Sequence, residues 1–230
     1  MWRKQDELGT SPATAVKARG NAPRSGEALI KTRISNGLKE FLLQLEGVGR
    51  GTLLDMGPAW QATVRFFVDR GYKLYTEDLL VSWRDFLRAE QEALRSLPAG
   101  AAIPVESAGA RAERFLQSNL TQPANSVDAI LLWDVLDYLD GDVLPHFLTR
   151  ISTLLRDGGA ILAIFHTRTP ERFCRYRVLD EQNLEMMPAP LLVPPQHIYN
   201  NRQIQLLFER FHSSRAFMGR DQFREGVFVK

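Results

Sequence analysis

The arrangement of apolar residues after position 52 constrains this chain more than any other feature. Short apolar runs of strand length alternate there with segments of helical period. We predict strands at residues 52–56, 73–77, 114–118, 129–133 and 160–165, and helices at residues 59–70, 83–97 and 142–156. Because such alternation produces right-handed crossovers, it predicts a parallel sheet with helices on both faces and ligand sites at the carboxyl ends of the strands.

The C-terminal third departs from this alternation. Residues 167–199 contain five prolines, too many for a regular strand and helix unit, and we interpret them as an inserted lid. Residues 201–211 have a helical pattern, and residues 214–230 read as two strands around a polar turn at residues 219–226. Since a hairpin pairs its strands antiparallel, we expect an α/β fold, a three-layer α/β/α sandwich of about seven strands, mostly parallel with one antiparallel strand from this C-terminal hairpin.

The first residues differ in composition from the rest. Seven basic and three acidic side chains lie within the first 35 positions, and residues 9–26 are small, polar and interrupted by glycine and proline. We predict a flexible basic extension over residues 1–28 and one α/β domain over residues 29–230, with an amphipathic helix near its start. A solvated tail is the simpler interpretation of the extension, and contact with RNA or an acidic partner is the alternative.

Charge and composition exclude several classes of partner. Lys+Arg 29 against Asp+Glu 27 gives a formal net charge of +2, too small an excess for a general nucleic-acid-binding protein. No apolar run reaches the length of a membrane-spanning helix, and the N-terminus has no apolar signal region. The single cysteine, Cys174, cannot form an internal disulfide. We therefore expect a cytoplasmic protein with no membrane contact.

The turn after the first predicted strand has the features of a nucleoside site. The strand and turn read LLDMG, with Asp55 before Gly57, and the next strand ends in Glu77 and Asp78. A glycine at such a turn lets a ligand approach the backbone, and an acid about 20 residues further along is the usual acceptor for ribose hydroxyls. Both halves of a nucleoside site are therefore present in the sequence.

These residues resemble the class I S-adenosylmethionine-dependent methyltransferases. The resemblance covers about residues 50–230 and depends on four segments in order: LLDMG, the acid in KLYTED, SVDAILLWDVLDYLD and LLRDGGAILAIF. It implies a Rossmann-like fold, S-adenosylmethionine as cofactor and a methyl acceptor. The chain departs from the family's glycine-rich run at GPAWQ, residues 57–61, where only the first glycine is kept. Because a pyrophosphate needs those glycines, the departure disfavours a dinucleotide in particular.

The resemblance also implies positions around the cofactor. Asp55 and Gly57 would lie under the methionine moiety, with Asp55 near its ammonium, and Ala59 is a further cofactor-binding position because it is still small. Asp78 would bind the ribose hydroxyls, and Glu77 is the fallback if the strand register slips by one. The structural alternatives are a turn acid at Asp55 and an exposed loop acid at Asp78.

Three further positions follow from the third and fourth predicted strands. Asn119 would meet the adenine edge, unless it is a plain turn residue, and Trp133 and Asp134 would lie beside the sulfonium, although a tryptophan in an apolar run is more often part of the core. Methyl transfer requires mainly alignment, and a base only where the acceptor must lose a proton. His166 and Asp134 are the candidate bases, because they follow the fifth and fourth strands at the same edge.

The sequence thus favours an enzyme that transfers a methyl group from S-adenosylmethionine to a small-molecule acceptor. The alternative is a catalytically inactive protein of the same fold that serves as a binding or regulatory partner, which the GPAWQ turn favours. RNA modification through the N-terminal extension is a third and weaker hypothesis. The remaining histidines lack metal-ligand spacing, so no metal is expected. The acceptor, the methylated atom and the oligomeric state stay open.

Overall fold

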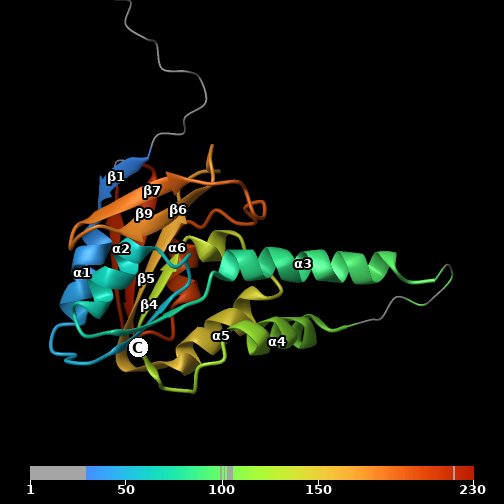
Figure 1. Ribbon diagram of the computed structural model, residues 1–230, viewed down its shortest axis with the longest axis horizontal. Helices are drawn as coiled ribbons and strands as arrows, with labels where there is room; N and C mark the ends of the chain where they lie inside the picture. The colour runs from blue at the N-terminus through green and yellow to red at the C-terminus, as the bar shows by residue number, and fades with distance from the viewer. Residues whose placement is uncertain (1–29, 99, 101, 103–105, 220) are drawn as a thin grey trace, which may run out of the picture.

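The computed structural model describes residues 30–98, 100, 102, 106–219 and 221–230 (Figure 1). The predicted basic extension, residues 1–28, lies outside the described residues. Through the body of the molecule runs a six-stranded sheet in the order β3-β2-β4-β5-β9-β8. Its strands are β3 (Lys73–Thr76), β2 (Thr52–Asp55), β4 (Val127–Trp133), β5 (Leu155–His166), β9 (Phe223–Val229) and β8 (Ser213–Met218).

Most of this sheet is parallel. β3, β2, β4 and β5 pair in parallel, and β9 runs antiparallel to both of its neighbours. β8 and β9 form the predicted C-terminal hairpin. The α/β fold with a mostly parallel sheet and one reversed strand is therefore confirmed, and the register brings the carboxyl ends of β2, β3 and β4 to the same edge, with Asp55 opposite Thr76 and Leu131.

Helices cover both faces of the sheet. α1 (Asn36–Gln44) and α2 (Gln61–Val68) pack on one face, and α4 (Ala108–Asn119) and α5 (Leu144–Leu154) pack on the other. Each face has its own cluster of buried apolar side chains, and successive residues of β4 contribute to one cluster and then the other. β4 is consequently buried along its whole length, as expected for a central strand of a three-layer sandwich.

The strand predicted at residues 114–118 is wrong, because this segment belongs to α4. Ser107 caps the helix by accepting a hydrogen bond from a backbone N–H of the first turn, and Ala112, Phe115 and Leu116 form its buried stripe. A run of five residues is too short for its period to distinguish a strand from a helix. The Ser107 cap and the buried apolar face stabilise this segment as a helix.

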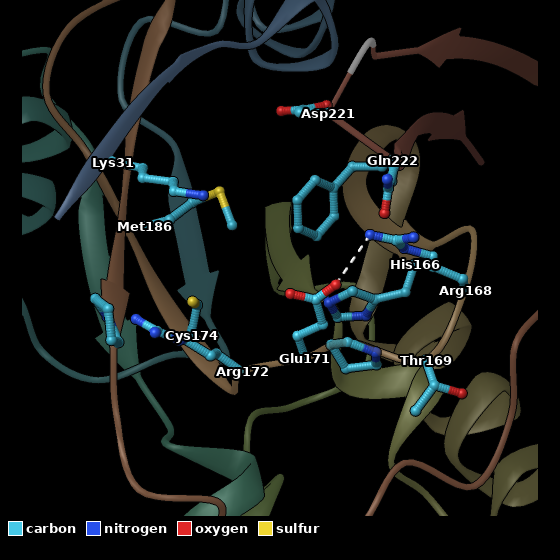
Figure 2. Close-up of a pocket in the computed structure, with 13 residues that line it drawn as sticks. Lys31, His166, Arg168, Thr169, Glu171, Arg172, Cys174, Met186, Asp221 and Gln222 are labelled. Carbon is cyan, nitrogen blue, oxygen red and sulfur yellow. Dashed lines mark hydrogen bonds and ion pairs between the residues drawn. The ribbon is translucent and has the colours of Figure 1, made fainter. Parts of the chain in front are cut away.

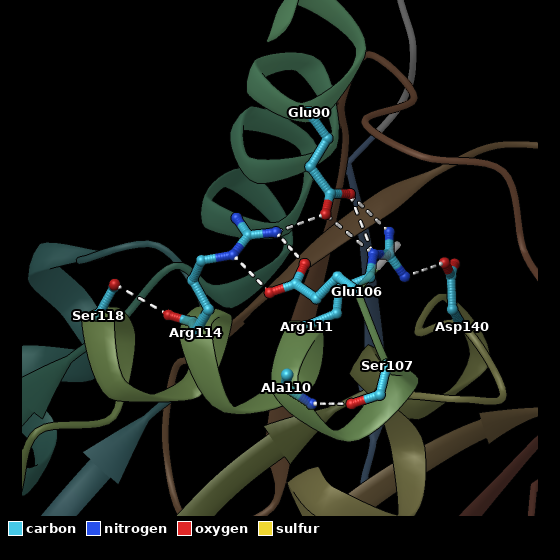
Figure 3. A network of polar contacts seen from close by, with 8 residues as sticks. All are labelled: Glu90, Glu106, Ser107, Ala110, Arg111, Arg114, Ser118 and Asp140. Carbon is cyan, nitrogen blue, oxygen red and sulfur yellow. Dashed lines mark hydrogen bonds and ion pairs between the residues drawn. The ribbon is translucent and has the colours of Figure 1, made fainter. Parts of the chain in front are cut away.

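Ion pairs to the neighbouring helix further stabilise the helical state of α4. α3 (Leu79–Arg95) begins earlier than predicted, and its Glu90 accepts hydrogen bonds from Arg111 (2.8 Å) and Arg114 (2.9 Å) of α4, as Figure 3 shows. The pair of helices extends away from the sheet (Figure 1). α4 therefore occupies the stretch of sequence in which we predicted a third strand.

The inserted segment forms a sheet of its own. Its strands β6 (Cys174–Val178) and β7 (Asn183–Pro188) pair antiparallel, and β1 (Lys31–Ile34), which the sequence did not predict, joins them in the order β1-β7-β6. Hydrogen bonds from β6 to Asp78 and Asp134 fix this small sheet over the carboxyl ends of β3 and β4. We call residues 167–199 the insertion.

α6 (Asn201–Leu207) follows the insertion and leads into the hairpin. Its cap, Asn200, forms a capping box with Gln203, which explains why the helix begins there. In the part of the chain that the structure describes, no helix has the length and apolar character needed to cross a membrane.

Candidate functional site

A tryptophan fills the turn after β2. Asp55 Oδ1 accepts hydrogen bonds from Gly57 N (2.9 Å) and Trp133 Nε1 (2.6 Å), and Asp55 is only 1% exposed. A Cβ atom on Gly57 would come within 2.7 Å of Trp133 Nε1, so only glycine fits beneath the indole. Ala59, further along the turn, is exposed. The structure thus brings Asp55, Gly57 and Trp133 together, with the indole over the turn.

Trp133 adopts a backbone conformation that bulky residues rarely take. Its φ of 53° lies in the left-handed region. The indole stacks on the ring of Tyr176 from β6, with 5.6 Å between centroids and 9° between planes, and both side chains are buried. Strain of this kind persists where the surrounding packing fixes it, often at functional sites. We call Asp55, Gly57, Trp133 and Tyr176 the closed edge.

Asp78 lies at the carboxyl end of β3, where the sequence predicts the ribose acid. It caps α3 by accepting a hydrogen bond from Val81 N (3.4 Å), and it forms an ion pair with Arg175 of β6. Glu77 instead lines a separate cavity of about 580 Å³ along β3, and burial raises the pKa of its carboxyl. Asp78 therefore contacts β6, whereas Glu77 lines the cavity along β3.

The structural basis of the prediction for Asn119 is wrong. Asn119 ends α4 instead of following a strand, and its side-chain amide donates to Phe115 O (2.7 Å). It lines the same cavity as Glu77, together with Thr52 at the start of β2. Because α4 leads into β4, which begins at Val127, Asn119 precedes the amino end of that strand.

His166 and Asp134 meet in a buried polar cluster at the ends of β5 and β4. His166 Nδ1 lies 2.8 Å from Asp137 Oδ2, which also accepts the backbone N–H of His166 (2.9 Å), and His166 Nε2 lies 3.8 Å from Asp134 Oδ2. The 3₁₀ turn η1 (Val135–Asp137) carries Asp137 there. The sequence analysis missed Asp137 although it lies within the segment WDVLDYLD, because only the fold brings it to His166.

Burial and charge act in opposite directions on these groups. Burial raises the pKa of Asp55 and of Asp134 to about 6, and the charge of His166 opposes this rise at Asp134. For His166, burial lowers the pKa, but the hydrogen bond to Asp137 and the charges of Asp134 and Asp137 outweigh burial, and the pKa is raised. A buried carboxyl with a pKa raised to about 6 beside an imidazole with a raised pKa is an arrangement typical of proton-transfer sites.

A cavity of about 620 Å³ opens beside His166 (Figure 2). Its walls come from β1, β7, the first part of the insertion and the start of β9, and they include Lys31, Cys174, Met186 and Phe223. A volume in this range accommodates a small molecule. We call it the His166 cavity.

Cys174 faces this cavity without an activating partner of its own. Burial raises the pKa of its thiol, which leaves the thiol in its weakly nucleophilic protonated form. Across the described residues, no group of three His, Cys, Asp or Glu side chains is arranged to hold a metal ion.

Comparison with known proteins identifies relatives of this chain. A family model described as a methyltransferase domain matches residues 29–212. Among solved structures, the chain is similar to an S-adenosylmethionine-dependent methyltransferase from Mesorhizobium loti, with 14% identity, a TM-score of 0.47 and coverage of 83% of this chain and 96% of that chain. It is also similar to the 1,6-didemethyltoxoflavin-N1-methyltransferase of Burkholderia thailandensis, with 14% identity, a TM-score of 0.44 and coverage of 85% and 78%. No curated protein matches the chain in sequence.

Proposed function

The chain belongs to the methyltransferase domain family, and from that premise we propose that it is an active S-adenosylmethionine-dependent methyltransferase whose acceptor is a small molecule. One observation carries the proposal. The His166–Asp137 pair, with 2.8 Å between Nδ1 and Oδ2, borders a cavity of about 620 Å³ at the same edge of the sheet as Asp55 and Asp78. A candidate base and candidate cofactor acids therefore lie along one edge of the sheet.

The carboxyl groups at this edge of the sheet complement the positive charges of S-adenosylmethionine. The cofactor carries an ammonium and a sulfonium against one carboxylate, and the edge offers three carboxyl groups, on Asp55, Asp78 and Asp134. Asp78 keeps 26% of its side chain exposed, so it can exchange its partner Arg175 for ribose hydroxyls. Binding also requires the ring of Trp133 to leave space over Gly57, because the indole lies against that glycine.

The residues beside the His166 cavity would orient the acceptor and move its proton. S-adenosylmethionine, when bound, supplies a methyl group on a positively charged sulfur. Asp137 accepts the Nδ1–H of His166, which leaves a lone pair on Nε2. Nε2 would take the proton of an acceptor hydroxyl or amine, which would leave an electron pair on the acceptor available for the methyl group. The Asp134 carboxylate, 3.8 Å from Nε2, stabilises the imidazolium.

The closed edge favours a second candidate function, a catalytically inactive protein of the same fold. Trp133 and Tyr176 stack over the glycine turn, and Arg175 neutralises Asp78. In this alternative the insertion keeps the cofactor position permanently filled, and the chain serves as a binding or regulatory partner.

Formation of S-adenosylhomocysteine distinguishes the two functions. The purified protein is incubated with S-adenosylmethionine and pools of small hydroxy and amino compounds, and the product is measured by mass spectrometry. We expect product from at least one pool, and less from Asp78→Asn, which keeps an oxygen for the α3 cap and loses the charge. A folded protein that neither binds S-adenosylmethionine nor forms product would support the inactive alternative.

A further inference from the structure

The charges around the His166 cavity do not balance. Three cations line it, Lys31, Arg168 and Arg172, against two carboxylates, Glu171 and Asp221. Each carboxylate already has a cationic partner. Glu171 accepts from Arg168 (3.2 Å), and Asp221 pairs with Arg33 (2.7 Å), which lies outside the lining.

Two cations are left over. Among the residues that the structure describes, neither Lys31 nor Arg172 forms an ion pair, and both side chains are exposed at the cavity. Figure 2 shows them on one side of the cavity, near Cys174, with the Arg168–Glu171 pair on the other side. Burial raises the pKa of the Cys174 thiol, and the charges of Lys31 and Arg172 both oppose that rise, so the two cations act on the same wall.

The rest of the lining is largely apolar. Met186 and Pro188 come from β7, and Phe223 comes from the start of β9. A cavity of about 620 Å³ with such walls suits a molecule of roughly one or two rings. His166 stands among these groups as the side chain able to exchange a proton.

We propose that the His166 cavity binds a small molecule with an apolar, ring-sized body and an acidic group, a carboxylate or a phosphate, and that Lys31 and Arg172 select the acidic group. The cations hold the anion on one wall, which leaves the apolar body to pack against Met186 and Phe223. The assignment of this molecule as the methyl acceptor rests on the proposed function, whereas its binding does not.

The test is a ligand-observed NMR titration with three probes, in the absence of S-adenosylmethionine. Benzoate and phenyl phosphate carry the two acidic groups, and benzamide is the neutral counterpart of benzoate. We expect at least one acid to bind about tenfold more tightly than benzamide, because two charge-assisted contacts are available only to the anion. The better acid identifies which of the two anions the site prefers.

The variant Lys31→Gln/Arg172→Gln should reduce this preference to about twofold or less. The matched control is Lys39→Gln/Arg202→Gln, which removes the same charge from exposed positions on α1 and α6 outside the cavity lining and should keep the preference. Equal binding of the acids and benzamide, no binding of any probe, or the same loss in both double variants would overturn the proposal. Acid binding without methyl transfer would leave this inference standing and count against the proposed function.

Discussion

The closed edge and the His166 cavity lie at the same end of one sheet, yet they are built differently. At the closed edge, Trp133 covers Asp55 and stacks on Tyr176, and the side chains are buried. At the His166 cavity, charged side chains surround about 620 Å³ of open space.

The same strand borders both regions. β6 carries Cys174, which lines the cavity, and Tyr176, which completes the closed edge. The insertion therefore contributes a wall to one region and fills the other. The difference teaches that one insertion can stabilise packed aromatic side chains at the closed edge and leave charged side chains around open space at the His166 cavity.

The largest expected effect concerns the His166 cavity. His166→Gln should lower kcat by about 10²–10⁴-fold while S-adenosylmethionine affinity stays unchanged, because the variant loses the proton acceptor and leaves the closed edge intact. In the wild type, activity should rise with pH through the raised pKa of His166, because only the neutral imidazole accepts a proton.

Rates of S-adenosylhomocysteine formation across a pH series measure this effect. His212→Gln, an exposed histidine outside the cavity lining, is the control and should behave like the wild type. A His166→Gln enzyme with the wild-type pH profile would remove His166 from the mechanism.

The next effect concerns the packing of the closed edge. Trp133→Ala should lower the free energy of unfolding by about 3–5 kcal/mol, because it empties a buried site and breaks the stack on Tyr176. Urea denaturation measures the loss, and Trp60→Ala, at a partly exposed position, should lower the free energy of unfolding by only about 1 kcal/mol. Similar small losses in both variants would mean that the closed edge is loosely packed.

A smaller effect follows from the buried carboxyl of the closed edge. The pKa of Asp55 is raised by burial from 3.8 to about 6, so the wild type loses stability as the pH rises between these values. Asp55→Asn keeps an oxygen for Gly57 N and Trp133 Nε1 and carries no charge. It should be more stable than the wild type by about 1–3 kcal/mol at neutral pH, with no advantage near pH 4.

Thermal or urea denaturation at the two pH values measures this difference. The exposed Asp69→Asn serves as the control, since its side chain is 66% exposed. A stability difference for Asp55→Asn that does not change with pH would show that the carboxyl is not held in a raised-pKa environment.

The smallest effect tests whether the insertion competes with the cofactor. Arg175→Ala should raise the affinity for S-adenosylmethionine by about tenfold, because ribose hydroxyls no longer have to displace the guanidinium from Asp78. Arg177→Ala removes a guanidinium from the same strand that pairs with Glu185 instead, and should leave the affinity unchanged. Weaker binding in Arg175→Ala would indicate that the arginine supports the cofactor.

The local pattern of apolar residues was sufficient to predict the central strands of the sheet. β2, β4 and β5 are apolar runs, and glycines border β2 and lie within the N-terminal half of β5. The positions of these strands and their common carboxyl edge therefore followed from the sequence. The strand predicted at residues 114–118 failed because its helical state depends on Ser107 and on Glu90 from another helix. The five-residue segment itself contains neither of these two residues, so its own sequence could not indicate the helix.

The candidate site was predictable only in part for the same reason. Alternation placed six of the residues at one edge, because each of them ends a strand or follows one closely: Asp55, Gly57, Asp78, Trp133, Asp134 and His166. Asp137, Arg175 and Tyr176 reach that edge through η1 and β6, and their contacts depend on how these elements pack. Tertiary contacts of this kind leave no periodic signal in a single sequence.

The central claim is that S-adenosylmethionine binds at the carboxyl edge beside Asp78. Calorimetric titration of the full chain with S-adenosylmethionine and S-adenosylhomocysteine, repeated on Asp78→Asn, tests it most directly. We predict micromolar binding to the wild type and a loss of about tenfold or more in the variant. No heat from either ligand with a protein shown to be folded, or equal binding by the variant, would contradict the claim.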